Sequence, residues 1–151
     1  MASSSNVPER RRPPLVLLDA NALFLPFDEG IDVLREVARW RPGARVGVPS
    51  AVLDELAKLE RRTVAHADLA LRLALRLEVH RTAARGDDAV LELAVREGAA
   101  VVTADRELRD RLSAAGLTVL VPRDRSRLEP YQRRKRAATV MNRPPLARRR
   151  R

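Results

Sequence analysis

Residues 15–21 read LVLLDAN, and this stretch decides the fold class. Its four consecutive apolar residues are typical of a central strand that is buried on both faces of a parallel sheet. The run ends at Asp19, so a carboxylate directly follows the strand. In open parallel sheets, functional side chains collect beyond the carboxyl ends of the strands, where the strand order reverses. We therefore expect Asp19 to lie at a functional edge of a sheet.

Beyond Asn21, segments with apolar residues at helical spacing alternate with short apolar runs. The predicted order begins with a helix over 31–40, a strand over 46–48, a helix N-capped by Ser50, a helix over 63–77 and a short edge strand at 78–79. It continues with a helix that is capped by Asp87 or Asp88 and ends near Gly98, a strand over 99–103, a helix over 105–115, and a strand over 117–121 closed by Pro122. This alternation predicts an α/β fold, a three-layer α/β/α sandwich with a central parallel sheet.

Composition excludes several function classes. The chain of 151 residues fits one domain and has no cysteine, which rules out a disulfide framework, a thiolate zinc site and a cysteine nucleophile. No serine-centred arrangement accompanies His66 or His80, and no glycine-rich phosphate loop follows the first strand. No apolar run is long enough to span a membrane, so we expect a cytoplasmic protein.

The net charge of +10 is concentrated at one end of the chain. Residues 1–122 hold 18 Lys and Arg against 18 Asp and Glu, whereas residues 123–151 hold 12 against 2. We expect a flexible segment over 1–14, a folded domain over 15–128 and a disordered basic tail over 129–151. A solubility tail, a contact with an acidic protein or an artificial appendage are alternatives, but such a tail favours nucleic acid, which it would bind without reading sequence. The candidate RNA-binding residues are Arg133, Arg134, Lys135, Arg136, Arg148, Arg149, Arg150 and Arg151.

Two carboxylates, Asp19 and Asp105, follow separate buried strands. An unpaired carboxylate in such a place is costly unless a cation satisfies it, and oxygen ligands suit Mg²⁺ or Mn²⁺. Glu55 and Asp87 are further candidates. Each has a simpler explanation: Asp87 could cap a helix, and Glu55 could be an exposed charge paired with Lys58.

Taken together in order, these acids give the chain a resemblance to a known family. The stretches that carry it are 16–23 (VLLDANAL), 48–59 (VPSAVLDELAKL), 87–94 (DDAVLELA) and 101–108 (VVTADREL). In this order and context the sequence resembles the PIN-domain (PilT N-terminus-like) ribonucleases over residues 15 to 128. The closing stretch over 106–128 looks like the branch linked to ribosomal RNA processing. Ala20 replaces a threonine that is often found there, and the apolar Val90 favours Asp87 over Asp88 in the alignment.

The resemblance implies a PIN-like fold and a divalent-metal-dependent endoribonuclease that cleaves RNA phosphodiesters, with Mg²⁺ or Mn²⁺ as cofactor. It assigns the catalytic and metal-binding roles to Asp19, Glu55, Asp87 and Asp105, with Asn21, Asp88 and Thr103 as secondary site residues. Structured or ribosomal RNA is the expected partner, and such domains often pair as homodimers. The alternatives are a VapC-type toxin neutralised by an antitoxin, and a non-catalytic RNA-binding scaffold whose acids are structural.

Overall fold

The computed structural model describes residues 12–132, and within this range it contains one sheet of six strands. The order across the sheet is β3-β2-β1-β4-β5-β6, so β1 and β4 are neighbours at its centre. The first five strands are parallel, and β6 runs antiparallel to β5. The strands are β1 (Leu15–Leu18), β2 (Arg45–Pro49), β3 (Glu78–His80), β4 (Ala100–Val102), β5 (Val119–Arg123) and β6 (Arg127–Pro130).

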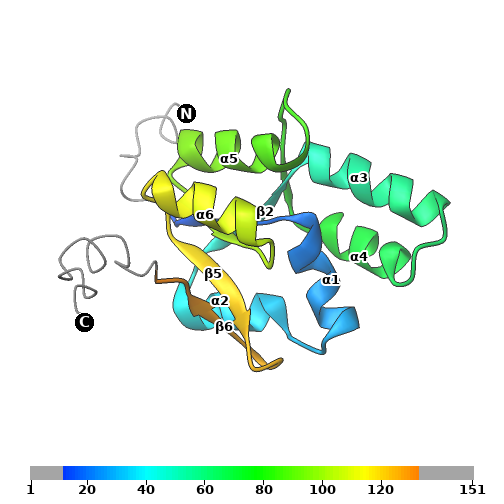
Figure 1. Ribbon diagram of the computed structural model, residues 1–151, viewed down its shortest axis with the longest axis horizontal. Coiled ribbons are helices and arrows are strands. Elements are labelled where there is room, and N and C mark those ends of the chain that lie inside the picture. Colours follow the sequence, from blue (N-terminus) through cyan, green and yellow to red (C-terminus); the bar gives the residue numbers. More distant parts are fainter. Residues whose placement is uncertain (1–11, 133–151) are drawn as a thin grey trace, which may run out of the picture.

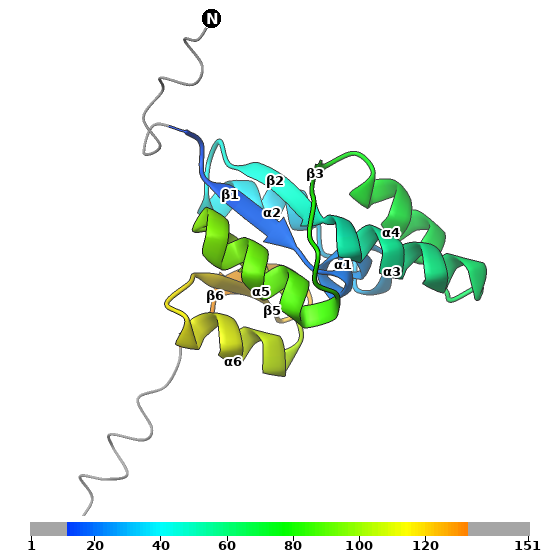
Figure 2. The same ribbon diagram turned by 90° about the horizontal axis from the view of Figure 1, so that it is seen from above.

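Helices flank this sheet and complete the sandwich (Figure 1). α5 and α6 lie together on one face, and α2 lies on the other (Figures 1 and 2). α3 packs against α4, and α4 also packs against α1 at one end of the sheet. The helices of the described range are α1 (Ala20–Asp28), α2 (Val33–Trp40), α3 (Ser50–Arg61), α4 (Ala67–Ala74), α5 (Gly86–Glu97) and α6 (Arg106–Ala114).

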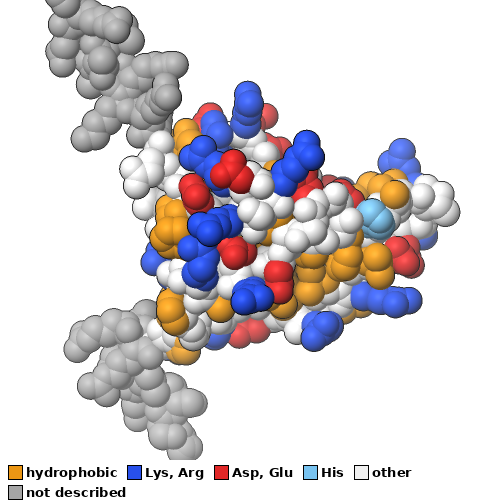
Figure 3. All heavy atoms as spheres, turned by 90° about the horizontal axis from the view of Figure 1, so that it is seen from below, with side chains coloured by type: hydrophobic (Ala, Val, Ile, Leu, Met, Phe, Trp, Pro, Cys, Tyr) orange, Lys and Arg blue, Asp and Glu red, His pale blue; other side chains and the backbone are white. Residues whose placement is uncertain are grey.

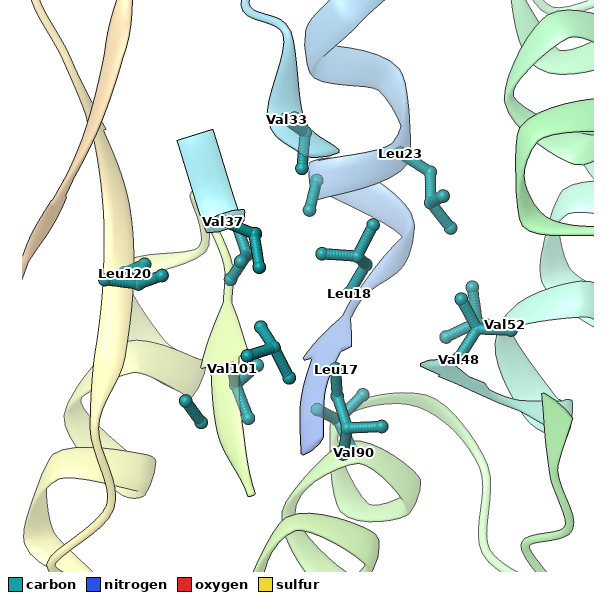
Figure 4. Packing of buried hydrophobic residues seen from close by; sticks show 14 of the residues in the cluster. Leu17, Leu18, Leu23, Val33, Val37, Val48, Val52, Val90, Val101 and Leu120 are labelled. Carbon is teal, nitrogen blue, oxygen red and sulfur yellow. The ribbon is translucent and has the colours of Figure 1, made fainter. Parts of the chain in front are cut away.

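The apolar run of residues 15–18, which forms β1, lies at the centre of the core. All four residues of β1 are buried. Successive side chains of a strand point to opposite faces, so Leu17 lies beside Val90 of α5 and Leu18 lies on the side of α1 and α2 (Figure 4). This two-sided burial confirms β1 as a central strand of a parallel sheet, and it fixes the position of Asp19 at the end of the strand.

Several predicted boundaries were wrong. The helix expected over 63–77 is shorter, because Thr63 and His66 have positive φ angles of 53° and 68°. Ser50 does not cap α3; its hydroxyl accepts a hydrogen bond from the Thr82 N–H at 3.0 Å instead. Pro122 does not close β5, because it lies beyond Leu120, the last β5 residue that pairs with β4.

The last strand crosses residue 128, the boundary expected between the domain and the tail. β6 continues to Pro130, and the Tyr131 N–H then donates to the Val119 carbonyl at 2.8 Å. α2 holds β6, because the indole Nε1 of Trp40 donates to the Leu128 carbonyl at 2.6 Å. The tail positions named above and residues 1–11 lie outside the described residues. No helix among residues 12–132 is long and apolar enough to cross a membrane.

Candidate active site

The site begins where β1 and β4 end side by side. Asp19 follows β1, Thr103 follows β4, and both are buried, with exposed fractions of 5% and 0%. The Thr103 hydroxyl donates to Oδ2 of Asp19, and Oδ1 of Asp19 accepts the Ala22 N–H at 2.7 Å. Asp19 is therefore the N-cap of α1 and is held from two directions. The strand order reverses between β1 and β4, which is where ligands bind in open α/β sheets.

Asp105 is joined to Asp19 through the same hydroxyl. Its backbone N–H donates to Oγ1 of Thr103 at 3.0 Å. Its own carboxylate caps α6, because Oδ1 accepts the Leu108 N–H at 2.9 Å. Thr103 thus links the two aspartates that follow the central strands, and the secondary role predicted for it is to fix their relative position.

Asp87 and Glu55 approach this pair from two other helices. Neither Asp87 nor Asp88 caps α5, whose N-cap is Arg85, so the capping explanation for these residues was wrong. Asp87 lies in the first turn of α5 and interacts electrostatically with Asp19, Asp105 and Glu55. The beginnings of α1, α3, α5 and α6 converge at this edge of the sheet (Figure 1).

Asp88 points elsewhere. Its carboxylate forms an exposed ion pair with Arg111 of α6 at 2.8 Å. Asp87 has no ion pair of this kind among residues 12–132. The structure therefore brings Asp87 into the acid cluster, which we define as Asp19, Glu55, Asp87 and Asp105, and leaves Asp88 outside it.

Burial makes Asp19, Asp87 and Glu55 reluctant to ionise. It raises the pKa of Asp19 to about 7; the hydrogen bonds from Thr103 and Ala22 oppose this shift, whereas the charges of Asp87 and Asp105 add to it. The pKa of Asp87 is raised by burial and then by Asp105, and that of Glu55 by burial and then by Asp87. No basic side chain within the described range forms an ion pair with Asp19. This is the state expected of carboxylates whose counter-charge is a bound cation.

Two hollows adjoin the cluster. One, of about 570 Å³, is lined by Asn21, in the first turn of α1, and by Ala104. The other, of about 540 Å³, contains Glu55 together with three basic side chains, Lys58, Arg61 and Arg85. Sequence analysis identified Glu55 and Asn21 but not the two arginines, because no local pattern shows which basic residues face a site formed by distant segments.

The donor set fits Mg²⁺ or Mn²⁺. Hard oxygen atoms are the ligands these ions prefer, and Mg²⁺ is usually held by one or two carboxylates with water and phosphate oxygens completing its shell. In the part of the chain that the structure describes, no three acidic or histidine side chains form a ready-made metal site. His66 and His80 take no part, since each pairs with a carboxylate elsewhere, Asp28 and Glu78.

An α/β/α sandwich with this strand order and with acids after its two central strands defines the class of protein. The chain belongs to the family described as PIN like domain, whose model matches residues 16–125. Among solved structures, that of the PIN domain endonuclease Utp24 is similar, with 23% identity, a TM-score of 0.66, and coverage of 79% of this chain and 93% of that one. A search of curated proteins found no match.

Proposed function

We propose that this protein is a divalent-metal-dependent endoribonuclease that cleaves RNA phosphodiesters. The observation that carries the proposal is the buried, hard-to-ionise Asp19 at the point where the strand order reverses, with the charges of Asp87 and Asp105 acting on it and the charge of Asp87 acting on Glu55. Family membership and the likeness in fold to the endonuclease Utp24 support a nuclease. The basic side chains Lys58, Arg61 and Arg85 beside Glu55 support a polyanionic substrate.

In the proposed mechanism, Asp19 and Asp105 are the principal ligands, because they follow the two central strands and are held rigidly by Thr103. A bound Mg²⁺ or Mn²⁺ supplies Lewis acidity, which activates water and offsets the charge that builds on the phosphate. Asp87 and Glu55 complete the negative field that retains the ion. Asn21, which lines a hollow at the start of α1, would contact the substrate.

A role in ribosomal RNA processing is the finer part of the proposal. It rests on the resemblance of residues 106–128 to that branch of the family. The toxin and scaffold alternatives differ from it in behaviour: a toxin would arrest growth until its antitoxin is expressed, and a scaffold would bind RNA without cutting it.

The test is cleavage of a structured, end-labelled RNA with Mg²⁺ or Mn²⁺. Wild type is compared with the double variant Asp19→Asn with Asp105→Asn and with a chain that stops after residue 132, beyond β6. We expect metal-dependent cleavage that the double variant loses, and a shortened chain that is weakened mainly in binding. If wild type and double variant bind RNA equally and neither cuts it with either metal, the scaffold interpretation replaces ours.

A further inference from the structure

A third hollow lies between α6 and the β5–β6 hairpin, with a volume of about 300 Å³. Its wall carries three arginines, Arg106, Arg109 and Arg123, and one aromatic residue, Tyr131. These positions are separate from the acid cluster, and the mechanism above makes no use of them. We propose that this hollow, here called the hairpin hollow, is a phosphate-binding subsite for the RNA strand that the acid cluster cuts, an inference that rests on the proposed function.

Its arginines are available for a phosphate group. Arg123 pairs with Glu129 at 3.2 Å and Arg109 with Asp110 at 3.0 Å, but all four side chains are partly exposed to solvent. Exposed ion pairs of this type contribute little stability, so a phosphate can displace or share them at small cost. Arg106 has no ion-pair partner among residues 12–132. Arginine suits this role because its planar fork can bind two phosphate oxygens at once.

One arginine is already held in position. The guanidinium of Arg109 lies over the Tyr131 ring, 4.2 Å from its centroid. The backbone N–H of Tyr131 donates to the Val119 carbonyl at 2.8 Å, and its hydroxyl donates to Oδ1 of Asp110 at 3.3 Å. Only Nε of Arg109 is used in the bond to Asp110. A stacked guanidinium loses little side-chain freedom when it binds a ligand, so it favours a specific contact.

The hairpin hollow neighbours the hollow that contains Asn21. Ala104 lines both this hollow and the one that contains Asn21. Asp105 of the acid cluster stands between Ala104 and Arg106 in the sequence. A strand lying over the cluster can therefore pass Ala104 and enter the hairpin hollow without leaving the surface.

Tyr131, which lines the hollow, is close in sequence to the basic tail. The described chain ends one residue after Tyr131, and the sequence continues with Arg133, Arg134, Lys135 and Arg136. On the face shown in Figure 3, basic and acidic side chains are mixed beside a band of hydrophobic side chains. A surface of mixed sign gives no strong preference for phosphate, whereas the lining of the hairpin hollow holds three arginines and no acidic residue.

The test measures RNA binding by the full chain in EDTA, so that binding is separated from cleavage. The hollow variant is Arg106→Gln with Arg123→Gln. The matched control is Arg72→Gln with Arg76→Gln, which removes the same charge from exposed positions on α4 and just after it. The probe is a fluorescently labelled single-stranded RNA, followed by anisotropy over a series of KCl concentrations.

We expect the hollow variant to bind about tenfold more weakly, with a salt dependence that falls by about 1.4 in log–log slope, the value for two lost phosphate contacts on a single strand. The control should stay within about twofold of wild type. Equal weakening in both variants would show a non-specific charge effect and would overturn the subsite. Polyglutamate binding that depends on the same two arginines as strongly as RNA binding would assign the hollow to an acidic protein and would also overturn it.

The two proposals fail separately. If RNA binding needs Arg106 and Arg123 but the protein does not cut RNA with either metal, the result would contradict the nuclease and support the subsite. Metal-dependent cleavage with unchanged binding and rate in the hollow variant would support the nuclease and contradict the subsite.

Discussion

Replacing Asp19 by asparagine should stabilise the metal-free protein at pH 8, even though it removes a proposed ligand. Burial raises the pKa of Asp19 from 3.8 to about 7. Below pH 3.8 the carboxyl is protonated in both the folded and the unfolded state, so its ionisation does not change the free energy of unfolding. As the pH rises to about 7, only the unfolded state loses the proton, so the free energy of unfolding falls, and above about 7 the loss is complete.

The size of the effect follows from that shift. A pKa difference of roughly three units corresponds to about 4 kcal/mol at high pH, of which about 3 kcal/mol is lost between pH 5 and pH 8. Asparagine has no such penalty, and its carbonyl and amide can still bond the Ala22 N–H and Oγ1 of Thr103. The Thr103 hydroxyl proton must then find another acceptor, so we expect a net gain of about 2 to 4 kcal/mol.

The assay is urea unfolding in EDTA at the two pH values, followed by circular dichroism. Wild type should lose stability from pH 5 to pH 8 by about 3 kcal/mol more than Asp19→Asn does. Adding Mn²⁺ at pH 8 should recover stability in wild type and not in the variant. A variant that is less stable than wild type at pH 8 in EDTA, or that has the same pH dependence, would refute the reasoning.

Three further predictions concern the support of the site. Thr103→Val keeps the shape of a fully buried residue but leaves Oδ2 of Asp19 without its hydrogen-bond donor. The free energy of unfolding in urea should fall by about 1 to 3 kcal/mol, and Mn²⁺ affinity measured by calorimetric titration should fall about tenfold. Trp40→Phe removes the bond to the Leu128 carbonyl and should cost about 1 kcal/mol while Mn²⁺ affinity stays the same, which the same two measurements check. The Mn²⁺ affinity of wild type should rise with pH up to about 7, and binding should release a proton from Asp19, because the ion must displace the carboxyl proton. An affinity that does not change with pH would contradict the raised pKa of Asp19.

The central part of the fold could be predicted because it depends on local, strongly apolar signals. β1 is a run of four apolar residues, Asp19 directly follows it and Asp105 comes soon after β4, so their position at one edge follows from parallel topology. β6 was missed because its four residues, RLEP, carry only one fully buried side chain, Leu128, and end in proline. β6 pairs with β5, and α2, far away in sequence, holds it through the bond from Trp40 to the Leu128 carbonyl.

The finer features of the site depend on contacts between distant segments. Ser50 has the residue type of a helix cap, but Thr82 takes its hydroxyl, and nothing near Ser50 in the sequence shows this. Asp87 and Asp88 are chemically identical neighbours, and only the position of Arg111 on α6 shows which one turns away. The arginines of the hairpin hollow come from α6 and β5, so they could not be grouped before the fold was known.

The most direct test of the central claim compares cleavage by Asp87→Asn and Asp88→Asn under single-turnover conditions with Mn²⁺. The two variants change adjacent residues and remove the same charge, so net charge and the tail are equal in both. The account predicts that Asp88→Asn cuts RNA within about threefold of wild type, because it loses only an exposed ion pair, whereas Asp87→Asn is slower by about a hundredfold or more. If both variants cut at the wild-type rate, the acid cluster is not the catalytic centre.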